Sequence, residues 1–314
     1  AIAPDGRFIA VDWIQVIFNP TFPARLAHMV LGAYLSTALV VGAGSAWRLL
    51  RQPDQAESKI GVRMAIGMFA VVATLQLFIG DVSGKIVGEL QPAKLAAIEG
   101  FWDTRTAQPF HIVAWPDRAT QKNDWSVSVP KVGSLITHGR IDAEVRGLKS
   151  FPRADQPPAV VVFWAFRIMV GLGLAMIALG LWGALLWQRK AIERTRLFLW
   201  ACVAMGPMGF VAVIAGWTVA EVGRQPFTVY GLLRTADSAS PVLAGQVSAS
   251  LIGFLAVYAL VFSVGALYMV RLMAQGPGDA TQAGPPPETP SAPGSALAAA
   301  PDQDAVRRDV EGDR

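Results

Sequence analysis

Four side chains that can ligate a metal or carry a charge lie within, or directly after, the long apolar runs of this sequence. His28 lies near the start of the run Leu26–Trp47, and Met169 follows Arg167 by two residues in a later run. Glu221 comes directly after another apolar run. An ionised residue at the centre of a membrane helix costs roughly 2.5–3.5 kcal/mol, so these positions are candidates for function.

His28 and Met169 together have the chemistry of a haem site. Imidazole and thioether are both good iron ligands, and the pair makes a six-coordinate electron-transfer haem. Residues four apart share a helical face, so His28 shares a face with Gly32, and Met169 with Gly173. Small neighbours leave a slot for a planar macrocycle, and Arg167 can neutralise propionates. The alternatives are a histidine bonded at the membrane interface and a methionine that only fills a packing gap.

Glu221 can share one helical face with Trp217 and Arg224, which lie about one turn before and after it. A carboxylate here can ligate a metal or relay protons. The alternative is an interfacial ion pair with Arg224 that closes the helix.

Lys94 and Glu99 stand in the stretch "KLAAIEGFW". In a helix, residues five apart are offset by about 140°, so the two side chains would flank one site. An amine and a carboxylate can bind and deprotonate the hydroxyl groups of a quinol. The alternative is a solvated amphipathic helix. His111 and His138 lack metal-ligand spacing, and we expect them at the surface.

The composition indicates a membrane protein. Of 314 residues 53% are hydrophobic and 16% are charged, against about 25% charged in soluble domains. A membrane span takes about 20 apolar residues. The sequence therefore predicts an all-α polytopic membrane protein with five transmembrane helices, a folded outer loop domain and a disordered C-terminal tail. The predicted spans are Leu26–Trp47, Met64–Gly80, Ala159–Trp187, Leu197–Ala220 and Val242–Val270.

Lysine and arginine in the short connections set the predicted orientation. Residues 48–63 and 189–196 are rich in both, which places these connections in the cytoplasm. The net charge of +4 reflects this asymmetry, and we expect no nucleic-acid partner. The single cysteine, Cys202, excludes an internal disulfide. The predicted regions are 1–80 with the first two helices, 81–158 as the outer loop, 159–274 with three more helices, and 275–314 as a cytoplasmic tail rich in Pro, Gly and Ala.

Four stretches together resemble subunit I of the cytochrome bd-type quinol oxidases. They read "HMVLGAYLSTALVVGAGSAWRLL", "GDVSGKIVGELQPAKLAAIEGFW", "FWAFRIMVGLG" and "GWTVAEVGRQPF", and their order and spacing agree with that family. The resemblance extends from Ala1 to about Ala274. It implies a bacterial inner-membrane enzyme that reduces dioxygen to water with electrons from quinol. Its cofactors would be a low-spin haem b, a high-spin haem b, and a haem d or second high-spin haem b.

The resemblance also implies roles for individual residues. His28 and Met169 would be the axial ligands of the low-spin haem b, with Arg167 beside them. Lys94 and Glu99 would lie in a periplasmic quinol-binding loop, the segment 81–158. The remaining matches belong to the high-spin haem pair: Glu221 as a ligand, Trp217 near it, and Arg224 and Gln225 in the same signature.

Departures from the family pattern shape further expectations. Phe227 stands where the family usually has Trp, and the loop is short, as in the branch with the cyanide-insensitive oxidases. The family subunit begins with four further helices, so we expect this chain to be a C-terminal portion that alone does not reduce oxygen. Expected partners are the membrane, a second membrane subunit (subunit II) and a small single-helix subunit. The oxidase would be electrogenic without pumping protons.

Two other classes of protein remain open from the residues alone. A polytopic transporter could use His28, Arg167 and Glu221 as substrate or proton-relay groups, although the sequence has no internal repeat of the kind that many transporters show. A non-catalytic assembly subunit could use the same charges only to pair helices.

Overall fold

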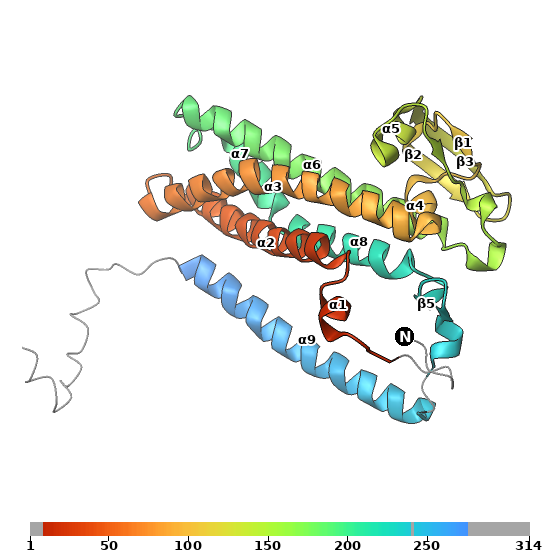
Figure 1. Cartoon of the computed structure of the whole chain (residues 1–314). Coiled ribbons are helices and arrows are strands. Elements are labelled where there is room, and N and C mark those ends of the chain that lie inside the picture. The colour runs from red at the N-terminus through yellow and green to blue at the C-terminus, as the bar shows by residue number, and fades with distance from the viewer. Residues whose placement is uncertain (1–8, 240–241, 276–314) are drawn as a thin grey trace, which may run out of the picture. The chain divides into compact units, whose positions relative to one another are not determined.

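The structure, a computed structural model, describes residues 9–239 and 242–275 (Figure 1). The contacts divide the chain into one unit from Ala1 to Ser248 and a second from Ala249 to Arg314, and each is described by itself. The tail predicted over 275–314 lies, from residue 276 onward, outside the described residues. That part of the prediction therefore remains a prediction.

Five helical segments are long and apolar enough to cross a membrane, as the sequence predicts. The fourth, 196–222, is two helices that meet at Gly206–Pro207, because proline lacks the N–H of a helical hydrogen bond and crowds the residue before it. The helices are α2 (Phe22–Arg51), α3 (Ala56–Leu90), α6 (Ala159–Gln188), α7 (Arg196–Met205) with α8 (Met208–Val222), and α9 (Ala244–Gln275). The short α1 (Trp13–Ile17) begins at Asp12, whose carboxylate accepts from two backbone N–H groups.

Helix α3 is longer than the predicted span Met64–Gly80, because it begins at Ala56 and continues to Leu90. Beyond Gly80 the apolar pattern weakens, and an ion pair one turn apart takes its place: Lys85 Nζ lies 2.6 Å from the Asp81 carboxylate. The first residues of the predicted outer loop are thus helical.

We call the segment from Pro92 to Asp155 the lobe. It begins with α4 (Pro92–Glu99), which ends at Gly100 in the left-handed conformation (φ 68°). Strands β2 (Phe110–Asp117) and β3 (Lys122–Val129) form an antiparallel hairpin. The other elements are β1 (Arg105–Thr106), α5 (Val132–His138), β4 (Glu144–Val145) and the 3-10 turns η1 (Leu148–Ser150) and η2 (Arg153–Asp155). After α8 come β5 (Phe227–Val229), β6 (Leu233–Arg234) and the turn η3 (Thr235–Ser238). The fold is mostly helical as predicted, and these short strands are what the all-α prediction left out.

The helices of the first unit pack as a bundle (Figure 1). Helices α2 and α6 both pack against α3, α7 and α8, so they share three neighbours. One buried core, here called the far core, joins residues 35–49 of α2, 62–73 of α3, 176–186 of α6 and 198–202 of α7. A second buried core joins the lobe to the first residues of α6 and to Val219 of α8.

Between these two cores lies a level of the bundle where three helices have no fully buried residue, although Val87, Phe166 and Leu172 pack against a core while partly exposed. Within the described helices, no residue is buried over 22–34 of α2, 74–90 of α3 or 166–175 of α6. We call these stretches the lobe-side interval. A Cβ atom added to Gly84, Gly171 or Gly173 there would meet nothing within 4 Å. Protein interiors are normally close-packed, so this level is where a bound group can complete the packing.

Candidate functional site

His28 stands in the lobe-side interval and turns one edge of its ring toward α3. A Cβ atom on Gly80 would lie 3.4 Å from His28 Cε1 and 3.8 Å from Nδ1. His28 Nδ1 is buried and has no hydrogen-bond partner among the described residues. Because a buried polar atom left unpaired costs about 1–3 kcal/mol, this nitrogen is set up for a partner.

Met169 stands in the same interval, but its sulfur contacts α8. A Cβ atom on Gly216 would lie only 2.8 Å from Met169 Sδ, so glycine is what leaves room for the thioether. His28 and Met169 thus project from the two helices that share α3 and α8 as neighbours. Gly32, expected to border an open slot, instead faces Gln76, whose Nε2 lies 3.7 Å from its Cβ position.

These features fit a haem. The interval offers an imidazole and a thioether as donors, and glycines with open space beside them. Within the described ranges, no group of three or more His, Cys, Asp or Glu side chains is placed to hold a metal ion. Shared ligation of one iron by His28 and Met169 stays a prediction.

Arg167 connects the membrane helix α6 to the lobe. Its Nη2 lies 2.8 Å from Glu99 Oε2, with 10% and 5% of the two side chains exposed. Its Nε and Nη2 also donate to the backbone oxygen of His111, at 3.1 and 2.7 Å. The guanidinium lies 4.5 Å from the ring centre of Phe163. The ion pair is therefore enclosed on several sides.

Lys94 is buried as well, so a solvated amphipathic helix is the wrong interpretation of α4. Lys94 and Glu99 are each 4% exposed. Lys94 Nζ donates to the backbone oxygen of Ala220, 3.1 Å away near the end of α8. Burial, and then the positive charges of Arg25 and Arg224, lower the pKa of Lys94 to about 8, while Glu221 acts in the opposite direction. A lysine with this pKa can exchange a proton near neutral pH.

Glu221 forms an ion pair with Arg224, three residues on. Both side chains are partly exposed, and Arg224 Nε is a buried donor to which the described chain offers no acceptor. Gln225 accepts a hydrogen bond from Thr235 Oγ1 at 2.8 Å, which ties the end of α8 to the turn η3. Trp217 is 67% exposed and therefore free to cover a neighbouring group.

His111 is buried, so the prediction that it lies at the surface is wrong. It is 8% exposed, and its Nε2 lies 3.4 Å from Asn123 Nδ2. Burial, followed by the charges of Arg167 and Arg105, lowers the pKa of His111 to about 4. Successive side chains of β2 point to opposite faces of the hairpin, so the sequence indicates that one face is buried but not which one. His138 is exposed, as predicted.

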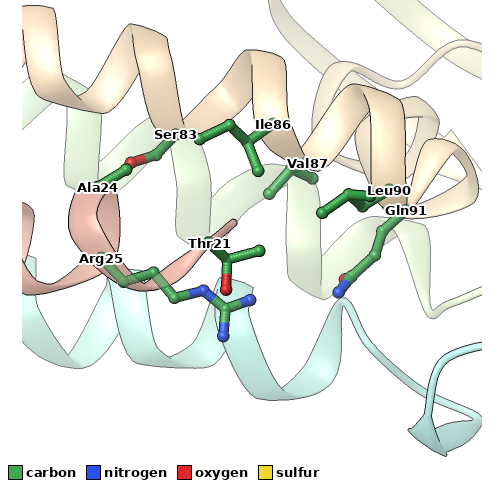
Figure 2. A pocket seen from close by; sticks show the side chains of 8 residues that line it. All are labelled: Thr21, Ala24, Arg25, Ser83, Ile86, Val87, Leu90 and Gln91. Atoms are coloured by element: carbon green, nitrogen blue, oxygen red, sulfur yellow. The ribbon is translucent and has the colours of Figure 1, made fainter. Parts of the chain in front are cut away.

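A small cavity lies between the start of α2 and the end of α3 (Figure 2). Its volume is about 30 Å³, far below the roughly 300–1,000 Å³ of ligand pockets, but enough for a water molecule. Gln91 Oε1 is buried without a partner in the described part of the chain, so it can accept from such a water. The lining residues are Thr21, Ala24, Arg25, Ser83, Ile86, Val87, Leu90 and Gln91.

Sequence reasoning missed two residues that the structure brings to the site. Gln76 of α3 donates from Nε2 to the backbone oxygen of His28 at 3.0 Å. Asn123 of β3 bonds to the backbone oxygen of Gly100 and accepts from Trp102 Nε1. Gln76 could have been found from the sequence, because its side chain is a polar amide inside the predicted span Met64–Gly80. Polar side chains in membrane spans are candidates for function.

The comparisons with known proteins agree with one another. The family model described as cytochrome bd terminal oxidase subunit I matches residues 1–277. The chain is 29% identical to cytochrome bd-II ubiquinol oxidase subunit 1 of Escherichia coli (strain K12), over 86% of this chain and 65% of that protein. It is 31% identical to cytochrome bd ubiquinol oxidase subunit 1 of Bacillus subtilis (strain 168), over 87% of this chain and 60% of that one.

Structural similarity leads to the same group of proteins. The bd oxidase structure from Geobacillus thermodenitrificans matches with a TM-score of 0.77 and 27% identity, over 87% of this chain and 63% of that one. The chain thus spans less than two thirds of the length of these relatives. Because the family model matches most of the sequence, this chain belongs to the cytochrome bd terminal oxidase subunit I family.

Proposed function

We propose that this chain is part of a membrane quinol:dioxygen oxidoreductase, a terminal respiratory oxidase. The observation that carries the proposal is the buried pair of Arg167 and Glu99. It joins an acid–base group of the lobe to the helix turn that holds Met169. A proton acceptor for quinol and a ligand for an electron acceptor are then adjacent, which oxidation of a quinol requires.

The quinol would bind at the lobe, where Glu99 accepts a proton from a quinol hydroxyl. Arg167 donates a hydrogen bond to Glu99 and fixes the direction of the carboxylate, which positions it to act as a base. Lys94 is a second group that can donate a hydrogen bond to quinol and exchange a proton. Loss of two electrons and two protons converts the quinol to a quinone, and the protons leave on the outer side.

His28 and Met169 would hold the low-spin haem b in the lobe-side interval. A haem held by imidazole and thioether takes up and passes on single electrons. Support comes from the donor set and the glycines that leave space. Arg167, two residues from Met169, would also lie close to the haem.

Glu221 would serve the oxygen-reducing part of the enzyme, a high-spin haem b with a haem d or a second high-spin haem b. Its carboxylate would be a ligand, with Trp217 beside it. Arg224 and Gln225 fix the end of α8, and the unpaired Arg224 Nε can receive an acidic group. Glu221 is the one ligand assigned to this pair, so we expect the chain alone not to reduce oxygen.

The setting would be the bacterial inner membrane, with the lobe in the periplasm and the tail in the cytoplasm. Partners would be subunit II and a small single-helix subunit. Protons for water formation would come from the cytoplasm, so charge is separated without pumping. The placement follows from the lysines and arginines between α2 and α3 and between α6 and α7.

A reduced-minus-oxidised absorption spectrum of the purified oxidase tests the proposal. We expect a low-spin haem b band that is lost in His28→Ala and in Met169→Ala and kept in His138→Ala, a change at an exposed histidine. A colourless complex, or a low-spin haem b band that survives both ligand substitutions, would contradict the proposal.

A further inference from the structure

Two buried polar atoms without partners lie at one contact between α2 and α3. One is His28 Nδ1, and the other is the side-chain oxygen of Gln76, Oε1. Gln76 and Gly80 are four residues apart, so they share a face of α3. The His28 ring lies against Gly80, and Gln76 Nε2 donates to the His28 backbone oxygen at 3.0 Å. Gln76 and the glycine that the His28 ring contacts are therefore about one helical turn apart on α3.

The orientation of the ring decides which nitrogen is free for iron. The Nδ1–Cε1 edge lies within 3.8 Å of the Cβ position of Gly80, which leaves no room for a macrocycle on that side. Nε2 is then the nitrogen that can ligate iron, so Nδ1 carries the proton and needs an acceptor. Metal-ligating histidines almost always donate their other N–H to a carboxylate, a carbonyl or a water.

Gln76 Oε1 is the acceptor that fits. Among the described residues, the buried unpaired side-chain atoms that only accept are Gln76 Oε1 and Gln91 Oε1. Gln91 lies about four helical turns farther along and borders the small cavity.

We propose that Gln76 is a positioning residue for the haem ligand His28, a role that rests on the proposed function. Its Oε1 accepts the His28 Nδ1–H when haem is bound, while its Nε2 keeps the bond to the His28 backbone oxygen. One amide thereby fixes both the tautomer and the orientation of the imidazole. This hydrogen bond makes the imidazole a stronger donor to iron, which favours the ferric state.

The test is a redox titration of haem b in the complete membrane oxidase. Gln76→Leu keeps the size and removes the acceptor. We expect it to weaken ferric haem binding about tenfold relative to ferrous, which raises the midpoint potential by about 59 mV for one electron. The low-spin spectrum should remain, because both axial ligands are intact. Gln76→Glu retains an acceptor, so its potential should stay at or below that of the unaltered enzyme.

Thr37→Val is the matched control, since the Thr37 hydroxyl bonds to the Ala33 backbone oxygen within α2, outside the lobe-side interval, and its loss should leave the potential unchanged. An unchanged potential in Gln76→Leu, with haem b present, would overturn the inference. If Gln76→Leu fails to assemble, Gln76→Glu decides: a raised potential there contradicts the role, and an equal or lower one supports it. Absence of haem b from the unaltered oxidase would instead refute the proposed function.

Discussion

The far core and the lobe-side interval belong to the same bundle, yet they are built differently. The far core is closed by large apolar side chains such as Phe69, Phe198 and Leu39, each 1% exposed or less. The lobe-side interval contains His28, Gln76 and Met169, and it contributes no buried side chain from α2, α3 or α6 in the described residues. The far core is closed by its own side chains. The lobe-side interval has unpaired polar atoms and glycines with open space beside them.

This difference predicts that the far core determines stability and that the lobe-side interval determines haem binding. Substitutions in the far core should change the free energy of unfolding and leave the haem spectrum alone. Substitutions in the lobe-side interval should do the reverse. The junction with the lobe should respond in both ways, because there a buried ion pair is also the proposed quinol site.

Arg167→Leu should have the largest effect. It leaves the Glu99 carboxylate buried without its partner, and breaking a buried pair in this way costs about 3–5 kcal/mol. Thermal unfolding in detergent measures the loss, and quinol oxidation should fall with it. Arg167→Leu combined with Glu99→Gln should recover much of the stability but not the activity. Arg140→Ala, which breaks an exposed pair with Asp142, is the control and should change neither.

Phe69→Ala tests the far core alone. Phe69 is 1% exposed, and truncating a buried phenylalanine costs about 3–5 kcal/mol. We expect a lower unfolding temperature with an unchanged haem b band. Phe78→Ala is the comparison on the same helix, because Phe78 is 64% exposed. A change in the haem band of Phe69→Ala would show that the two ends of the bundle are not independent.

The sequence predicted the spans well and their ends less well. Hydropathy finds the apolar centre of α3. The helix continues beyond it through Asp81 and Lys85, which form an ion pair one turn apart. Because both residues are charged, a hydropathy window ends the predicted span before them. The sequence contains Gly206–Pro207 at the break between α7 and α8, yet it predicted one continuous span there. Hydropathy depends only on how apolar the residues are, so it does not detect the backbone hydrogen bond that proline removes.

The candidate site was predictable in residue type but not in environment. Lys94 and Glu99 were recognised, yet their burial depends on the lobe folding back over α4 and on Arg167, which is distant in sequence. His111 lies on a strand that the sequence prediction left out, and which face of the hairpin turns inward is a tertiary property. Gln76 was missed because it is uncharged, and its importance comes from an unpaired atom on a neighbouring helix.

Two glycine substitutions sharpen the comparison at a smaller scale. A Cβ on Gly180 would lie 2.7 Å from the backbone nitrogen of Ala70, so Gly180→Ala must push α6 from α3 and should cost about 1–3 kcal/mol. A Cβ on Gly216 would meet the flexible thioether of Met169, which can move. Gly216→Ala should therefore change the haem b spectrum with little change in unfolding temperature. Equal effects of both substitutions on both measurements would remove the distinction.

Lys94 should give the smallest effect, and it appears only as pH changes. The pKa of Lys94 is about 8 in the folded chain and about 10.4 when unfolded, so between these values the unfolded state binds the extra proton. Stability conferred by Lys94 must then rise with pH from about 8 to 10.4, because the penalty of burying its charge is relieved. Lys94→Met removes this contribution. The difference in unfolding temperature between the two proteins, measured from pH 7 to 10, should shift in favour of Lys94 above pH 8. A difference that stays constant from pH 7 to 10 would mean that the Lys94 amine is in contact with water in the folded protein. Its charge would then not be buried.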